Sequence, residues 1–168
     1  DGQLVFRNRT AFVQAEVKAD DLAASSELDG RIESSRASDV ETAGQVRLGY
    51  VDAQSSYELR SVETRFPDDT TVGVSQTDPP LALTKSEGLN SVERWLSEAR
   101  VARDTIRFAL PKSRLSIGAG DVIRYEGHRY RIDRVDQAES QLLDAVRVES
   151  GIYLPSDKAD ETISVRSF

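Results

Sequence analysis

Apolar positions recur at steps of three and four over residues 86–104, which is the spacing of one face of an α-helix. Thr84 and Glu87 stand at the start of this segment, as in a capping box that satisfies the free N–H groups of a first helical turn. Gly88 disfavours a start there, and Asn90 is the alternative. The pattern therefore predicts one prominent amphipathic helix, whose apolar face comprises Leu89, Val92, Leu96, Ala99, Ala102 and Ile106, widened by Trp95.

Short strand-like segments follow the helix. Residues 106–110 favour a strand that ends at Pro111, and a glycine-containing turn over residues 118–121 comes next. Val122–Tyr125 and His128–Val135 flank Glu126-Gly127, the spacing of a two-residue hairpin loop. A further strand is expected at Gln141–Glu149.

The register of this hairpin follows from its loop. If Tyr125 pairs with His128, then Ile123 lies opposite Tyr130. The expected apolar face comprises Ile123, Tyr125, His128, Tyr130 and Ile132, and the expected polar face comprises Val122, Arg124, Arg129, Arg131 and Asp133.

The first half of the chain is less regular. Its β-branched and aromatic residues predict strands at Leu4–Phe6, Phe12–Val17, Gln45–Val51, Tyr57–Phe66 and Thr70–Val74. Residues 18–44 are rich in Ala, Ser, Asp and Glu and read as a long irregular acidic loop, with a short helical turn near Asp20–Ala24.

These elements predict a mainly β fold with one prominent helix, built as small β-barrel-like domains. The expected domains are residues 1–83 with the loop 18–44, residues 84–155 with the helix and a small barrel, and a polar linker or tail over 156–168. The chain starts at Asp1 without a signal-peptide pattern and has no methionine, so we expect a fragment of a longer polypeptide.

Composition narrows the function classes. The chain has 168 residues, 38% of them apolar and 30% charged, which fits a globular fold rather than a disordered or membrane protein. The absence of cysteine excludes disulfides and thiolate sites. The net charge of −7 disfavours a dedicated nucleic-acid binder, because phosphates would be repelled.

No motif predicts catalysis, and we expect no catalytic, cofactor-binding or metal-binding residues. His128 is the sole histidine and reads as a strand residue rather than a general base. Asp20-Asp21 and Asp68-Asp69 could attract Ca²⁺ but read as solvated acidic loops. Gly118-x-Gly120 lacks the third glycine and the helix of a dinucleotide site.

Two further clusters have a structural and a functional interpretation. One comprises Arg124, Arg129, Arg131 and Arg134, which could contact DNA or an acidic partner but read as an outer face balanced by nearby acids. The other comprises Trp95, Phe108, Tyr125 and Tyr130, which could stack on sugars or bases but read as core.

From the helix onward the sequence resembles a phage tail-protein family of baseplate-hub, tail-tip and host-specificity proteins from siphophages and gene transfer agents. The segments that carry the resemblance are Leu110-Pro111, Gly120-Asp121-Val122, Tyr130-Arg131-Ile132, Arg134-Val135, Leu142, Ala145–Glu149 and Tyr153, with Val46–Asp52 and Tyr57 upstream. The resemblance spans residues 45–155.

The resemblance implies a non-enzymatic structural protein of the virion tail, assembled in the bacterial cytoplasm. It implies a homotrimeric hub ring that joins the tail tube to the tip, contacts distal-tail, tip or fibre proteins, lets DNA pass and does not insert into the membrane. A receptor- or glycan-binding module of the tail tip is the alternative. An enzyme that digests the cell wall would need paired carboxylates in a cleft.

Overall fold

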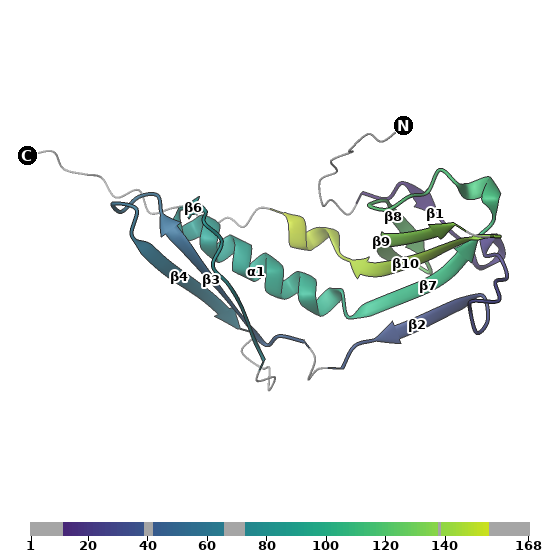
Figure 1. Ribbon diagram of the computed structural model, residues 1–168, viewed down its shortest axis with the longest axis horizontal. Coiled ribbons are helices and arrows are strands. Elements are labelled where there is room, and N and C mark those ends of the chain that lie inside the picture. The colour runs from purple at the N-terminus through teal and green to yellow at the C-terminus, as the bar shows by residue number, and fades with distance from the viewer. Residues whose placement is uncertain (1–11, 39–41, 66–72, 138, 155–168) are drawn as a thin grey trace, which may run out of the picture. The chain divides into compact units, whose positions relative to one another are not determined.

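The computed structural model describes residues 12–38, 42–65, 73–137 and 139–154 (Figure 1). Backbone contacts divide these residues into two compact units. Unit 1 comprises residues 12–38 and 98–153, and unit 2 comprises residues 42–97 and Leu154. Strands dominate the described residues and α1 (Lys85–Val101) is their one α-helix, so the predicted fold class, mainly β with one prominent helix, is confirmed.

Unit 1 is built on a six-stranded sheet in the order β1-β8-β9-β10-β7-β2. Its strands are β1 (Ala15–Glu16), β2 (Ile32–Arg36), β7 (Asp104–Leu110), β8 (Val122–Tyr125), β9 (His128–Gln137) and β10 (Gln141–Val148). The ends of the sheet, β1 and β2, do not pair with each other, so the sheet stays open and the predicted barrel is wrong. Three short 3₁₀ helices complete the unit: η1 (Ala19–Asp21), η3 (Lys112–Arg114) and η4 (Ser150–Tyr153).

The hairpin between β8 and β9 has the predicted register. Tyr125 pairs with His128 and Ile123 pairs with Tyr130. Glu126 and Gly127 both have positive φ, as a two-residue hairpin loop requires. Two side chains depart from the predicted faces: His128 is exposed, whereas Val122 is buried in a small cluster with Val148, Val13 and Tyr153.

One face of this sheet carries the main core of unit 1, and its fully enclosed side chains include Phe108, Leu110, Ile123, Ile132 and Leu143. A buried amide borders this core: Nε2 of Gln141 donates a hydrogen bond to the carbonyl of Ile117 at 2.7 Å. This bond fixes the segment that follows η3 to the first residue of β10.

The segment that leaves unit 1 after β2 and the segment that returns to it before β7 are hydrogen-bonded to each other. Strand β2 pairs antiparallel with β7, and the N–H of Ala37 donates to the carbonyl of Arg103 at 3.0 Å. The guanidinium of Arg103 in turn donates to the carbonyl of Ala37 from Nε (3.1 Å) and Nη2 (3.0 Å). The residues between them, which include residues 42–97 of unit 2, therefore start and end at neighbouring backbone positions of unit 1.

Unit 2 is a smaller sheet in the order β4-β3-β5, with β6 also paired to β3. Its strands are β3 (Gln45–Asp52), β4 (Leu59–Arg65), β5 (Val74–Thr77) and β6 (Ala82–Leu83). Alternate residues of β3 are buried, which explains its alternating sequence. Val46, Leu48 and Tyr50 form a core with Val62 of β4 and with Val92 and Leu96 of α1.

The start of α1 matches the predicted capping box. The N–H of Thr84 donates to Oε2 of Glu87 at 2.8 Å, and the N–H of Glu87 donates to Oγ1 of Thr84 at 3.2 Å. Gly88 lies in the first turn and is buried against the sheet, where Val62 and Tyr50 leave little room for a side chain. The predicted end at residue 104 is wrong, because the helix stops at Val101.

In the first half of the chain, several secondary-structure elements differ from the predicted ones. Residues 18–44 are not one irregular loop, since β2 lies within them and pairs with β7. The strand predicted at Phe12–Val17 is reduced to β1, and η1 overlaps the predicted helical turn. Strands predicted at Leu4–Phe6 and over residues 70–72 lie outside the described residues, and β5 begins at Val74.

Candidate interaction surface

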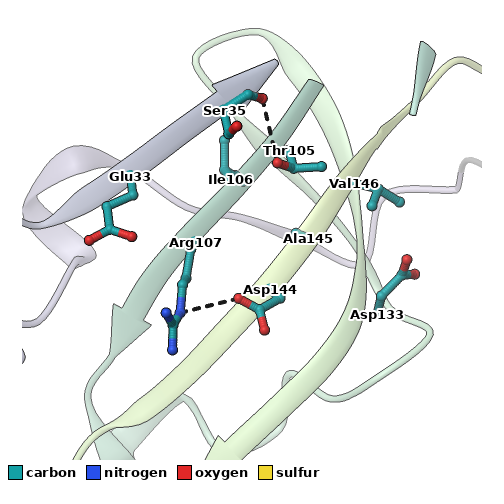
Figure 2. Close-up of a pocket in the computed structure, with 9 residues that line it drawn as sticks. All are labelled: Glu33, Ser35, Thr105, Ile106, Arg107, Asp133, Asp144, Ala145 and Val146. Atoms are coloured by element: carbon teal, nitrogen blue, oxygen red, sulfur yellow. Dashed lines mark hydrogen bonds and ion pairs between the residues drawn. The ribbon is translucent and has the colours of Figure 1, made fainter. Parts of the chain in front are cut away.

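A shallow pocket of about 350 Å³ lies on the face of the unit 1 sheet that is turned away from the main core (Figure 2). It crosses strands β2, β7, β10 and β9. We call it the acidic pocket, and its lining residues are Glu33, Ser35, Thr105, Ile106, Arg107, Asp133, Asp144, Ala145 and Val146. The lining contains three carboxylates and one guanidinium, so its formal charge is −2.

Each carboxylate of the acidic pocket has a partner. Asp144 lies 3.3 Å from Nε of Arg107, and Figure 2 shows this pair near the middle of the pocket. The geometry makes this an ion pair without a directed hydrogen bond from Nε. Asp133 accepts from Nε of Arg131 at 2.8 Å, and Glu33 accepts from the N–H of Asp29 at 2.8 Å. These contacts hold the acids in place and leave them open to solvent.

A β-bulge shapes one side of the acidic pocket. Asp144 of β10 pairs with Arg134, but the next residue, Ala145, pairs with Ile132, so Asp133 is an extra residue in β9. A bulge locally bends a strand and redirects a side chain. Here it adds the carboxylate of Asp133 to the lining beside Val146. The acidic pocket could not be predicted without strand β2, although Arg107 and Asp144 are polar residues within apolar strands.

The residues considered for catalysis or metal binding do not come together. His128 is exposed beside the hairpin loop. Asp21 accepts hydrogen bonds from the N–H of Lys18 (2.9 Å) and from Arg114 (2.7 Å), and these contacts, the backbone one first, lower the pKa of Asp21. Asp68-Asp69 lies outside the described residues. Gly120 has a positive φ in the turn before β8, as expected for a turn glycine.

Neither metal-ligand groups nor membrane spans emerge from the described residues. No three acidic or histidine side chains there are grouped to hold a metal ion. No helix in that part of the chain has the length and apolar character needed to cross a bilayer.

The arginine cluster is balanced by acids where the structure gives it partners. Arg131 pairs with Asp133 at 2.8 Å and Arg134 pairs with Asp136 at 3.0 Å. Both acids lie near the arginines along the chain, so the interpretation as a charged solvated surface is supported. Arg124 is exposed on the same hairpin.

The four aromatic residues do not form a stacking platform. Phe108, Tyr125 and Tyr130 are buried in the core of unit 1, and burial raises the pKa of both tyrosines. Trp95 packs, partly buried, against the core of unit 2. The four residues thus belong to two separate cores, as the structural interpretation predicted.

Exposed apolar residues gather instead at one end of unit 2. Leu59 is 85% exposed and Tyr57 is 72% exposed, at the start of β4 and in the turn before it. Leu59 pairs with Val51, which pairs in turn with Ala82, so these residues form a row across the sheet. Tyr57 has a φ of 57°, which is rare for a bulky residue. Exposed apolar side chains that form a contiguous patch are a common feature of interaction surfaces, whereas single ones are ordinary.

Comparison with known proteins places these features in a family. The chain matches the family described as "Putative phage tail protein" over residues 1–135. It is similar to a chain in the virion of a native gene transfer agent particle, with 48% identity, a TM-score of 0.90, and coverage of 95% of this chain and 37% of that chain. This chain thus spans little more than a third of that relative.

Two further solved structures are less similar. The 43 kDa tail protein of prophage MuSo2 from Shewanella oneidensis has 7% identity and a TM-score of 0.49, with coverage of 85% of this chain and 47% of that chain. The tail protein from Neisseria meningitidis MC58 has 13% identity and a TM-score of 0.45, with coverage of 84% and 45%. No match is found among curated proteins. On the family match and the 48% identity, the chain belongs to the phage tail-protein family.

Proposed function

We propose that this chain is a non-enzymatic part of a baseplate-hub ring, in which three copies surround an axial channel and join the tail tube to the tip. The observation that carries the proposal is the 48% identity over 95% of the chain to a component of a gene transfer agent virion. Since the chain spans 37% of that component, the remaining parts of a longer protein would supply further contacts.

The geometry supports an assembly role. Both sheets are open, and the edge strand β4 and the turn before it present the exposed apolar residues Leu59 and Tyr57. A chain that acts alone usually protects such features, because open edges and apolar patches promote association. In a ring, neighbouring copies or other tail proteins would cover them.

The charge supports a channel that DNA passes without binding. The chain has a net charge of −7, and an acidic wall repels phosphates, whereas a lysine-rich wall would hold them by counterion release.

The acidic pocket contains carboxylates that a cell-wall hydrolase could use as acid and base. Asp133 and Asp144 are 45% and 40% exposed, and both are paired with arginines. This arrangement favours a structural role.

A reconstruction of the tail end with this chain traced in it tests the proposal. We expect three equivalent copies in contact around the tail axis, inside the particle. A single copy at the periphery, without contact between equivalent copies, would overturn the ring and favour the receptor- or glycan-binding alternative. The burial of the four aromatic residues already weighs against that alternative as far as it needs them for stacking.

A further inference from the structure

Strand β2 forms an outer edge of the unit 1 sheet. In the described part of unit 1 it pairs only with β7, so its other side faces no strand. Natural proteins protect such edges with very short strands, prolines, bulges or charged side chains, above all lysine. The opposite edge, β1, has two residues, whereas β2 has five and contains neither proline nor lysine. The edge of β2 is therefore suited to accept an added strand.

The acidic pocket begins at this edge. Glu33 and Ser35 of β2 form its outer wall (Figure 2), and its formal charge is −2. Val146 adds an apolar side chain beside the carboxylates, whereas Ala145 faces the main core. An apolar side chain with acids around it suits the aliphatic stem and cationic head of a lysine or arginine. A strand that joins β2 would deliver alternate side chains to this face.

Strand β4 has the complementary features. It is an edge of the unit 2 sheet and has seven residues. Leu59 and Arg65 are both exposed, and their even spacing places them on one face of β4. Val62 lies on the opposite face, where it packs in the core with α1. The outward face of β4 thus carries Leu59 at its start and Arg65 at its end, and between them Glu63, whose charge is matched by Arg47 at 2.7 Å.

We propose that β4 of one copy adds to the β2 edge of a second copy, with Arg65 entering the acidic pocket and Leu59 becoming buried. This contact would be the interface between neighbouring copies in the proposed hub ring, and the inference rests on that proposal. Because the two surfaces differ, the contact is head-to-tail, and repetition of such a contact closes into a ring when the rotation allows it.

Engineered disulfides test the partner strand directly, since this chain contains no cysteine. Ser35→Cys is combined in turn with cysteine at each outward position of β4, namely 59, 61, 63 and 65, in the protein at its natural length. After oxidation of assembled particles, we expect covalent oligomers from at least one combination and from no single variant. Cross-linking by Ser35→Cys alone would mean that β2 meets β2, and cross-linking by none of the four would mean that β4 is not the partner; either result overturns the proposal.

A charge exchange tests the role of Arg65. Glu33→Arg or Arg65→Glu should weaken self-association of the natural-length protein about thirtyfold, because each leaves a buried charge without its partner. The double variant should recover most of the loss. Glu16→Arg, an exposed acid on β1, is the matched control and should leave the dissociation constant unchanged.

Failure of this contact is distinguishable from failure of the hub. A tail-end reconstruction that shows the ring, together with unchanged self-association in Glu33→Arg, would overturn only the β4–β2 contact. A reconstruction without contacts between equivalent copies would overturn both.

Discussion

Gly88 of α1 lies so close to Val62 of β4 that a Cβ atom added at position 88 would stand 3.1 Å from Cγ2 of Val62. The ring of Tyr50 borders the same space, with Cε1 at 3.5 Å. A helix glycine normally weakens a helix, but here it lets the helix approach the sheet closely.

Gly88→Val is therefore expected to lower the free energy of unfolding by about 1–3 kcal/mol, because the added branches overfill a packed contact. Arg94→Val, at an exposed position of α1, is the control for helix propensity alone and should cost less. Urea unfolding compares the two variants. Equal losses would mean that the approach of Gly88 to Val62 does not restrict side-chain size.

Leu96 is the second test of the helix packing. It is 2% exposed, so its predicted burial is confirmed, and Leu96→Ala should cost about 2–5 kcal/mol through the cavity it leaves. Leu115→Ala makes the same chemical change at a residue that is 52% exposed. That control should cost about 0.5 kcal/mol or less. Thermal or urea unfolding of both variants measures the difference.

The capping box predicts coupling between two side chains. Thr84→Ala should lower the free energy of unfolding by about 1 kcal/mol, because the N–H of Glu87 loses its acceptor. Glu87→Ala removes the reciprocal bond to the N–H of Thr84. In a double-mutant cycle the two losses should interact, since both belong to one motif. Strict additivity would argue against a cooperative cap.

The hydrogen bond of Gln141 is expected to contribute to the stability of unit 1. Gln141→Leu keeps the size of the side chain but leaves the carbonyl of Ile117 without its donor, which should cost about 1–3 kcal/mol. Gln137→Leu, at the exposed residue that pairs with Gln141 in the adjacent strand, is the control. Protection of amide hydrogens around Ile117 should fall only in the first variant. A stabilised Gln141→Leu protein would contradict the prediction.

The burial of Tyr50 leads us to expect that the free energy of unfolding depends on pH in the alkaline range. Burial, followed by the nearby carboxylate of Asp52, raises the pKa of Tyr50 above its ordinary value of 10.0. As the pH rises above about 10, the unfolded state loses the phenolic proton while the folded state keeps it, so the free energy of unfolding falls until the folded pKa is passed. Tyr50→Phe removes this contribution. Urea unfolding near pH 8 and again above pH 10 should show a smaller loss in Tyr50→Phe than in the natural chain, and equal losses would refute the effect.

Local patterns predicted those elements whose signals are local. The β8–β9 register followed from the two-residue loop, and the start of α1 followed from Thr84 and Glu87. Ile106 was expected both on the helix face and in a strand over residues 106–110; the strand is confirmed, because Ile106 belongs to β7, where it faces the core. Spacing alone cannot separate these two ways of burying one side chain.

Elements that are stabilised by pairing with strands far away in the sequence were not predicted. Strand β2 has the sequence Ile-Glu-Ser-Ser-Arg, which is polar because the strand is an edge and only Ile32 packs against the core. Its identity as a strand comes from β7, some 70 positions away along the chain. The acidic pocket depends on that pairing and on a bulge, and neither is visible in the local sequence.

The clamp between Ala37 and Arg103 has an evolutionary consequence. The two residues are 66 positions apart, yet the N–H of Ala37 donates to the carbonyl of Arg103 and the guanidinium of Arg103 donates to the carbonyl of Ala37. The entropy of closing a loop grows only with the logarithm of its length, and each doubling adds about 0.6 kcal/mol. The segment between the clamped residues can therefore be lengthened, shortened or exchanged at small thermodynamic cost to β2 and β7. Recombination between related tail genes could replace this whole insert while the sheet that receives it stays intact.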